Sequence, residues 1–269
     1  TGLSVFDGNK YITIGAKDSL PPIAVNKIFE DSKGNIFVAL RHSYTGFGGL
    51  FIIDENYEVI NFLKTHGIQE QGIEDIKEDE SGNLIFAGWM GLYIYDGTKV
   101  RHLRYGDGMG SGQVQDILAD NSNLWLATTD GLVHYNGSKF NNHGIKVVNS
   151  DLRKVFKSPN NELFVTPRST WGENKCGIYR YDGFQFNLLK SSQLYWNVWD
   201  IVFDESGGMF FNTSEYLIFS KDEFSQSLSP KRSTNLDMTW ITSIERSIDG
   251  TLMIGTWESG AWKYDMESI

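Results

Sequence analysis

The stretch Ile73-Glu-Asp-Ile-Lys-Glu-Asp-Glu-Ser-Gly-Asn-Leu-Ile-Phe-Ala87 decides the fold, because related stretches occur six times along the chain. A strand pattern ends at Asp79, a turn follows through Gly82 and Asn83, and a second strand of aliphatic and aromatic residues comes next. Glycine and asparagine tolerate the positive φ that a tight hairpin requires. The six copies begin at residues 25, 73, 114, 152, 198 and 241. Their mean period of about 43 residues is typical of four-stranded propeller blades.

Each copy continues into a second motif, seen at Gly91-Leu-Tyr-Ile-Tyr-Asp-Gly97 and matched at 131–137 and 177–183. The Asp-Gly and Asn-Gly pairs in it are strong hairpin signals, so each motif predicts a third strand, a turn and a fourth strand. No segment shows sustained helical periodicity, and we therefore predict an all-β chain.

Four-stranded antiparallel sheets bury both faces by packing on one another, so we expect a β-propeller, a single domain over 1–269. The chain length predicts six blades. The residues from Gly2 to Ile14 supply the latter half of a unit, whereas 241–269 supplies three strands. We expect the N-terminal strand to complete the C-terminal blade and close the ring. The inventory of strands exceeds six full blades by one, so seven blades or an open piece of a longer array stay as alternatives.

Composition excludes several classes of protein. The formal net charge is −10 and the pI is about 5.0, which disfavours nucleic acid because such binding depends on cationic contacts. The apolar runs are too short to span a membrane. The first residues carry no signal-peptide pattern, as expected of a mature or truncated chain. The single cysteine, Cys176, excludes an internal disulfide and a Cys-based zinc site.

The recurring pattern x-Ile-x-x-Asp-x-x-Gly-x-Leu-Trp-x-x-Thr, followed by Gly-Leu-x-x-Tyr-Asp-Gly-x-x-Phe, resembles the two-component regulator propeller repeat. The best matches are 78–97 and 120–140, while the fourth and fifth copies are degenerate at 158–161 and 214–217. The resemblance covers essentially the whole chain. It implies the extracytoplasmic sensor part of a bacterial two-component regulator or a related protein of the periplasm or cell surface. Kinase, phosphotransfer and DNA-binding segments are absent from the sequence.

Propeller topology places the connections between second and third strands, and between blades, on one face, which we call the site side. The opposite hairpin side carries short Gly and Asn turns. The site-side connections are longer and aromatic, and flat apolar rings beside polar groups suit sugars or peptides. The predicted ligand-binding residues on the site side are Arg41, Tyr44, Trp89, Arg168, Trp171, Trp196, Tyr216, Trp240, Trp257 and Glu258.

For any single one of these tryptophans, packing of the loops against one another is the favoured alternative, because large aromatic side chains are usually mostly buried. Trp125, Trp199 and Trp262 lie inside strand patterns and are expected in the core. Taken together, the site-side aromatic residues predict a small glycan or peptide ligand. Another surface protein, bound by a propeller that acts as a scaffold, is a further alternative.

Two enzymatic alternatives stay open beside a non-catalytic module. A sialidase-like hydrolase needs an arginine cluster with a Tyr/Glu nucleophile pair, for which Arg41, Arg168, Glu173 and Tyr44 are candidates by loop position, yet its Ser-x-Asp-x-Gly-x-x-Trp box is missing. Propeller lyases that act on cyclic peptides have a similar repeat and would use a histidine. The five histidines are scattered, and we expect each at the solvated surface; they are His42, His66, His102, His134 and His143.

No cofactor or metal is predicted. The acidic stretch from Asp75 to Glu80 offers a weak alternative, a Ca²⁺ site formed with Glu78 and Asp79. Side chains alternate across a strand and do not converge, so a solvated run of charge is the favoured interpretation.

Overall fold

The computed structural model describes residues 2–6, 8–42, 48–70, 72–143, 151–168, 177–190, 198–213, 217–221, 226–227, 241–247, 249–257 and 260–264. These residues form 25 strands and three very short helices, so the predicted all-β class is confirmed. The chain divides into two compact units, Thr1–Gly144 and Ile145–Ile269.

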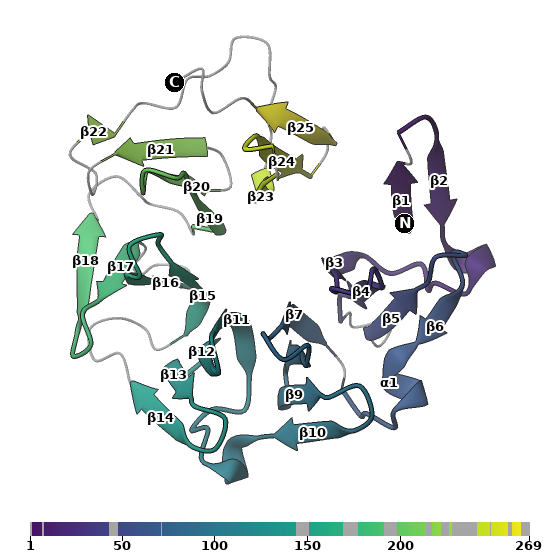
Figure 1. Cartoon of the computed structure of the whole chain (residues 1–269), viewed down its shortest axis with the longest axis horizontal. Coiled ribbons are helices and arrows are strands. Elements are labelled where there is room, and N and C mark those ends of the chain that lie inside the picture. The colour runs from purple at the N-terminus through teal and green to yellow at the C-terminus, as the bar shows by residue number, and fades with distance from the viewer. Residues whose placement is uncertain are drawn as a thin grey trace. The chain divides into compact units, whose positions relative to one another are not determined.

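Unit 1 contains one hairpin and three four-stranded antiparallel sheets, here called blades 1 to 3. The first strands β3, β7 and β11 lie side by side, and the fourth strand of each blade lies at its outer edge (Figure 1). The strands are β1 (Leu3–Phe6) and β2 (Tyr11–Ile14); β3 (Val25–Glu30), β4 (Ile36–Leu40), β5 (Gly49–Ile53) and β6 (Val59–Asn61); β7 (Ile73–Glu78), β8 (Leu84–Gly88), β9 (Gly91–Tyr95) and β10 (Val100–Leu103); β11 (Val114–Asp120), β12 (Asn123–Thr128), β13 (Gly131–Tyr135) and β14 (Phe140–His143).

Unit 2 contains blades 4 to 6, of which the described part of blade 6 has three strands. Its strands are β15 (Leu152–Lys157), β16 (Leu163–Pro167), β17 (Ile178–Tyr181) and β18 (Phe186–Lys190); β19 (Asp200–Phe203), β20 (Met209–Asn212), β21 (Leu217–Lys221) and β22 (Gln226–Ser227); β23 (Ile241–Arg246), β24 (Leu252–Thr256) and β25 (Ala261–Tyr264).

The six successive antiparallel blades confirm the predicted β-propeller fold and its blade count. The described strands number 25, as the sequence predicts. Five blades have four strands, the described part of blade 6 has three, and β1 pairs with β2 in a separate two-stranded sheet. Closure of the ring by the N-terminal strand concerns the position of one unit relative to the other, and it stays a prediction.

The first strand of five blades begins where the repeat predicts, and β19 begins two residues later, at Asp200. These same five strands share a register shift after their first residue, as between Ile73 and Asp75. Such β-bulges re-aim a side chain at the end of a strand. The residues skipped by the pairing are Asn26, Glu74, Gln115, Arg153 and Thr242.

Both repeated turns are held by hydrogen bonds from their own motif residues. In the first, Asp79 Oδ1 accepts the backbone N–H of Asn83 at 2.8 Å, and Gly82 has φ of 78°. In the second, the Tyr95 hydroxyl donates to the carbonyl oxygen of Gly97 at 2.8 Å. The carboxylate of Asp96 accepts three hydrogen bonds from residues 98 and 99, which hold its pKa at about 2. The motif therefore specifies turns, as predicted.

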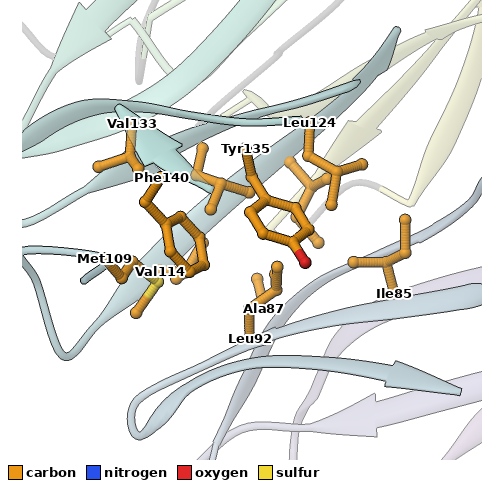
Figure 2. Packing of buried hydrophobic residues seen from close by; sticks show 11 residues of the cluster. Ile85, Ala87, Leu92, Met109, Val114, Leu124, Val133, Tyr135 and Phe140 are labelled. Carbon is orange, nitrogen blue, oxygen red and sulfur yellow. The ribbon is translucent and has the colours of Figure 1, made fainter. Parts of the chain in front are cut away.

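Buried side chains between successive blades form the cores. Between blades 2 and 3, Ile85 and Leu92 pack against Leu126, Tyr135 and the neighbouring apolar residues (Figure 2). The face-to-face burial of apolar area between blades is the main stabilising contribution, as in other stacked sheets.

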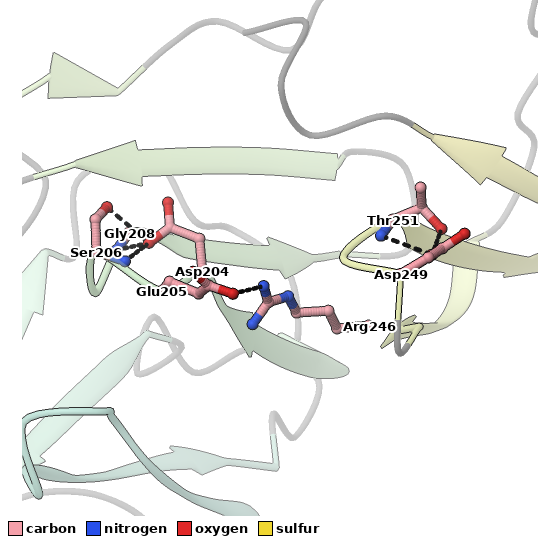
Figure 3. Close-up of polar contacts among 7 residues, drawn as sticks. All are labelled: Asp204, Glu205, Ser206, Gly208, Arg246, Asp249 and Thr251. Atoms are coloured by element: carbon pink, nitrogen blue, oxygen red, sulfur yellow. Dashed lines mark hydrogen bonds and ion pairs between the residues drawn. The ribbon is translucent and has the colours of Figure 1, made fainter.

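Polar contacts on the hairpin side also join successive blades. The Glu205 carboxylate, in the turn after β19, lies 2.9 Å from the Arg246 guanidinium of blade 6 (Figure 3). At the equivalent position of blade 1, the Ser32 hydroxyl donates to Glu78 of blade 2 at 2.6 Å. Contacts at these hairpin-side turns therefore join blade 1 to blade 2 and blade 5 to blade 6.

The three helices are local features that strand periodicity does not predict. The longest of them, α1 (Phe62–Thr65), has four residues, and its N-cap residue Asn61 accepts the backbone N–H of Lys64. The described residues include no helix that is long and apolar enough to cross a membrane.

Candidate functional site

The turn of residues 89 and 90 joins β8 to β9 on the site side of blade 2. Ile73, the first residue of the innermost strand, pairs with Gly88 at this end of the blade. The bulge at Glu74 therefore aims its side chain toward the turn.

The indole of Trp89 is held in place by residues of blades 1 and 2. Its Nε1–H donates to Glu74 Oε1 at 2.6 Å, and the His42 ring meets it edge-on with ring centroids 4.7 Å apart. Asn26 donates its amide to Glu74 Oε2 at 3.2 Å and to the Ile73 carbonyl at 2.9 Å. Although anchored, the Trp89 side chain is 42% exposed. It is thus a fixed aromatic surface that solvent and ligands can reach.

A buried carboxylate, that of Glu70, accepts hydrogen bonds from the backbone of the same turn. Glu70, 7% exposed, accepts the backbone N–H of Met90 at 2.9 Å and that of Gly72 at 3.2 Å. It fills the space beside Gly88, where a Cβ would collide with its Oε2. Burial and the neighbouring Glu70 carboxylate raise the pKa of the Tyr93 hydroxyl. Glu70 therefore fixes the backbone that presents Trp89.

The corresponding turn of blade 3 has a simpler construction. There the buried hydroxyl of Thr128 donates to the Gly131 carbonyl at 2.8 Å and accepts the backbone N–H of Asp130 at 3.2 Å. In blade 2 a glycine, Gly88, stands at the position of Thr128, and Glu70 supplies the missing acceptor. Blade 2 therefore holds this turn with a buried carboxylate from outside the hairpin, whereas blade 3 holds it with a residue of its own second strand.

Three further predicted residues lie where the sequence places them, at second-to-third strand connections. Arg41 and Arg168 directly follow β4 and β16, and their backbone N–H groups donate to Ala24 and Asp151, each at 2.8 Å. Both side chains are exposed. Trp257 follows β24 and is 67% exposed. Arg41 belongs to unit 1 with Trp89, whereas Arg168 and Trp257 belong to unit 2.

The other predicted site residues lie outside the described residues; they are Tyr44, Trp171, Trp196, Tyr216, Trp240 and Glu258. The assignment of the ten residues to a binding face therefore stays a prediction.

Sequence reasoning missed the residues at the bulge position of the first strands. In blade 1 and blade 2 this position holds Asn26 and Glu74, which contact each other. In blade 4 it holds Arg153, whose guanidinium lies 3.9 Å from the ring centroid of Trp199 at the same position of blade 5. Trp199 is half-buried, so its expected place in the core was wrong in part. The sequence does contain a signal for these residues. The second residue of the first strand varies from blade to blade and is mostly polar, whereas the strand around it is repeated.

The prediction that the histidines are solvated surface groups was also wrong. All five are half-buried and lie against aromatic rings. His66 stacks on Phe62 and His102 on Tyr93, each pair with ring centroids 4.1 Å apart. Desolvation lowers the pKa of His134 and that of His143. The five rings cover aromatic residues.

The acidic stretch considered for Ca²⁺ is dispersed among separate partners. Asp75 is fully buried, 2.8 Å from the Lys27 ammonium, and its Oδ2 accepts the backbone N–H of Ile117. Glu78 accepts from Ser32 and Asp79 closes its own turn. Across the described residues, no group of three metal-ligating side chains comes together.

Comparison with solved structures places this chain among extracellular domains, surface proteins and lyases of similar fold. The extracellular domain of the protein described as the hybrid two-component system BT3049 from B. thetaiotaomicron matches with a TM-score of 0.72 and 17% identity, over 94% of this chain and 34% of that chain. PorZ, a surface component of the type-IX secretion system of Porphyromonas gingivalis, matches with a TM-score of 0.66 and 14% identity, over 89% and 40%. Virginiamycin B lyase from Staphylococcus aureus matches with a TM-score of 0.63 and 11% identity, over 91% and 85%.

These likenesses show the fold, and the predicted resemblance to sensor-type propellers is confirmed at that level. The chain spans about a third of the BT3049 domain and two fifths of PorZ. No protein-family model matches the sequence. No curated protein matches it either.

Proposed function

We propose that this chain is a recognition module of a bacterial periplasmic or cell-surface protein and that it binds a glycan or peptide on its site side. The observation that carries the proposal is the anchored, exposed indole of Trp89, which Glu74 holds at 2.6 Å. A ring that is fixed before binding loses little conformational entropy when a ligand stacks on it. In a sensor, binding would act through the ends of the chain on whatever domain they are attached to.

The fold comparisons support the location and the class. Two of the similar structures are an extracellular domain and a surface component. On the hairpin side, the Asp79 carboxylate closes its own turn and the Glu205 carboxylate pairs with Arg246, so these two carboxylates are less available to a ligand.

A propeller lyase is the second candidate, favoured by a fold comparison and by the environment of His42. The match to the virginiamycin B lyase covers most of both chains. His42 lies on the site side, and its buried Nδ1 has no hydrogen-bond partner among the residues that the structure describes. A histidine in this position is a candidate general base or acid.

One screen separates the two candidates. The purified chain is tested against glycan and muropeptide panels, with and without Ca²⁺, and the bound fractions are analysed for reaction products. We expect binding without product formation. Conversion of a bound compound, abolished by His42→Ala, would favour the lyase instead.

Substitutions on the two sides locate the binding face. Trp89→Ala is expected to weaken binding at least about fivefold, because stacking on an aromatic side chain contributes about 1–3 kcal/mol. Phe184→Ala is the matched control, since Phe184 is 96% exposed at a hairpin-side turn. Equal loss in both variants, or loss only in Phe184→Ala, would contradict a site-side ligand.

A further inference from the structure

We infer that the Trp89 turn is a subsite for a protonated amine of the ligand. The inference deepens the proposed function and rests on it. The subsite consists of the indole of Trp89, the carboxylate of Glu74 and the exposed side chain of Met90.

The charge of Glu74 lacks a cationic partner among the described residues. Its two oxygen atoms accept only neutral donors, the indole N–H of Trp89 and the amide of Asn26. The adjacent carboxylate of Asp75 differs, because the ammonium groups of Lys27 and Lys77 lie 2.8 and 3.7 Å from it. A carboxylate has about four acceptor positions, so Glu74 retains capacity for further donors. A half-buried negative charge of this kind is complemented by a cation from outside the chain.

The indole beside that carboxylate favours the same ligand chemistry. The face of a tryptophan ring attracts an ammonium group within about 6 Å of the centroid. Met90, 51% exposed, adds an adaptable apolar surface next to the ring. An amine on a short aliphatic or sugar stem would contact the ring and Met90 with its carbon atoms and Glu74 with its charge.

The turn that presents Trp89 is held by a buried residue from outside its own hairpin. A threonine at position 88 would satisfy the turn as Thr128 does in blade 3. The chain uses Gly88 and a buried carboxylate, Glu70, in its place. Burying a carboxylate is costly unless hydrogen bonds compensate. The N–H groups of Met90 and Gly72 provide that compensation, so the backbone that presents the indole is fixed before a ligand binds.

The test uses small probes and the full chain. The Trp89 indole ¹⁵N–¹H resonance, assigned by its disappearance in Trp89→Phe, is followed during titration with Nα-acetyl-lysine amide and with its Nε-acetylated, neutral counterpart. A parallel pair, glucosamine and glucose, distinguishes an amino sugar from a peptide amine. Glu74→Gln removes the charge while keeping an acceptor for the indole, and Phe184→Ala, at an exposed hairpin-side turn of unit 2, is the control.

We expect at least one amine probe to bind at least tenfold more tightly than its neutral counterpart. Glu74→Gln should weaken that binding at least tenfold, and Phe184→Ala should leave it unchanged. Equal binding of charged and neutral probes, no shift with either amine, or binding within twofold of the parent in Glu74→Gln would overturn the inference. If a ligand from the glycan and muropeptide screen still binds on the site side in that case, the recognition function stands and only the amine subsite is wrong.

Discussion

Replacing Asp75 by alanine tests whether a buried ion pair joins blades 1, 2 and 3. Asp75 has no exposed surface, and the substitution leaves the Lys27 ammonium without its partner and the backbone N–H of Ile117 without its acceptor. Removing one member of a buried pair costs about 3–5 kcal/mol. Lys27 keeps about a quarter of its side-chain surface exposed, so we expect a loss near the lower end, about 3 kcal/mol.

The assay is urea unfolding followed by tryptophan fluorescence, in which the loss appears as a shift of the midpoint at constant slope. Asp75→Asn should lose less, because the amide oxygen still accepts the N–H of Ile117. Glu205→Ala is the matched control, since this carboxylate also pairs across blades but is 86% exposed, and exposed pairs contribute about 0–1 kcal/mol. A loss below about 1 kcal/mol in Asp75→Ala, or an equal loss in Glu205→Ala, would refute the assigned role.

Two further outcomes follow from the turns and the histidines. Gly91→Ala should lower the free energy of unfolding in urea by about 3 kcal/mol, because Gly91 has φ of 128° and a Cβ would collide with the Leu103 carbonyl. Gly97→Asn has open space at its Cβ and should lower it by about 1 kcal/mol or less. Similar losses in both variants would contradict the steric reason. The pKa values of His134 and His143 are lowered in the folded chain, so the unfolded chain binds more protons below about pH 6.5 and the free energy of unfolding should decrease as the pH falls through that value. Unfolding measured between pH 8 and 5 should show a shallower decrease in His134→Gln, and an unchanged decrease would exclude His134 as a source.

The repeated turns were predictable because each is held by residues within its own motif. Asp79 accepts N–H groups two and four residues further on, and Tyr95 donates to the carbonyl two residues further on. Local contacts of this kind leave a direct trace in the sequence pattern. The blade count follows from their period.

The detail of the site was not predictable because its contacts cross between segments. Glu70 acts on Met90, twenty residues away, and Asn26 reaches Glu74 of the next blade. Glu70 lies between two copies of the repeat, and Asn26 and Glu74 occupy a variable position within it, so periodicity does not predict which residues pair. Trp89 could be proposed as a site residue from its loop position, whereas Glu74 lies inside a strand pattern, where only the bulge turns it toward the site.

A crystal structure of the chain with a ligand from the glycan or muropeptide screen tests the central claim most directly. We predict that the ligand contacts the Trp89 turn, with an amine near the Glu74 carboxylate. A ligand seated on the Asp79 and Glu205 turns of the hairpin side, with the Trp89 ring untouched, would contradict the claim.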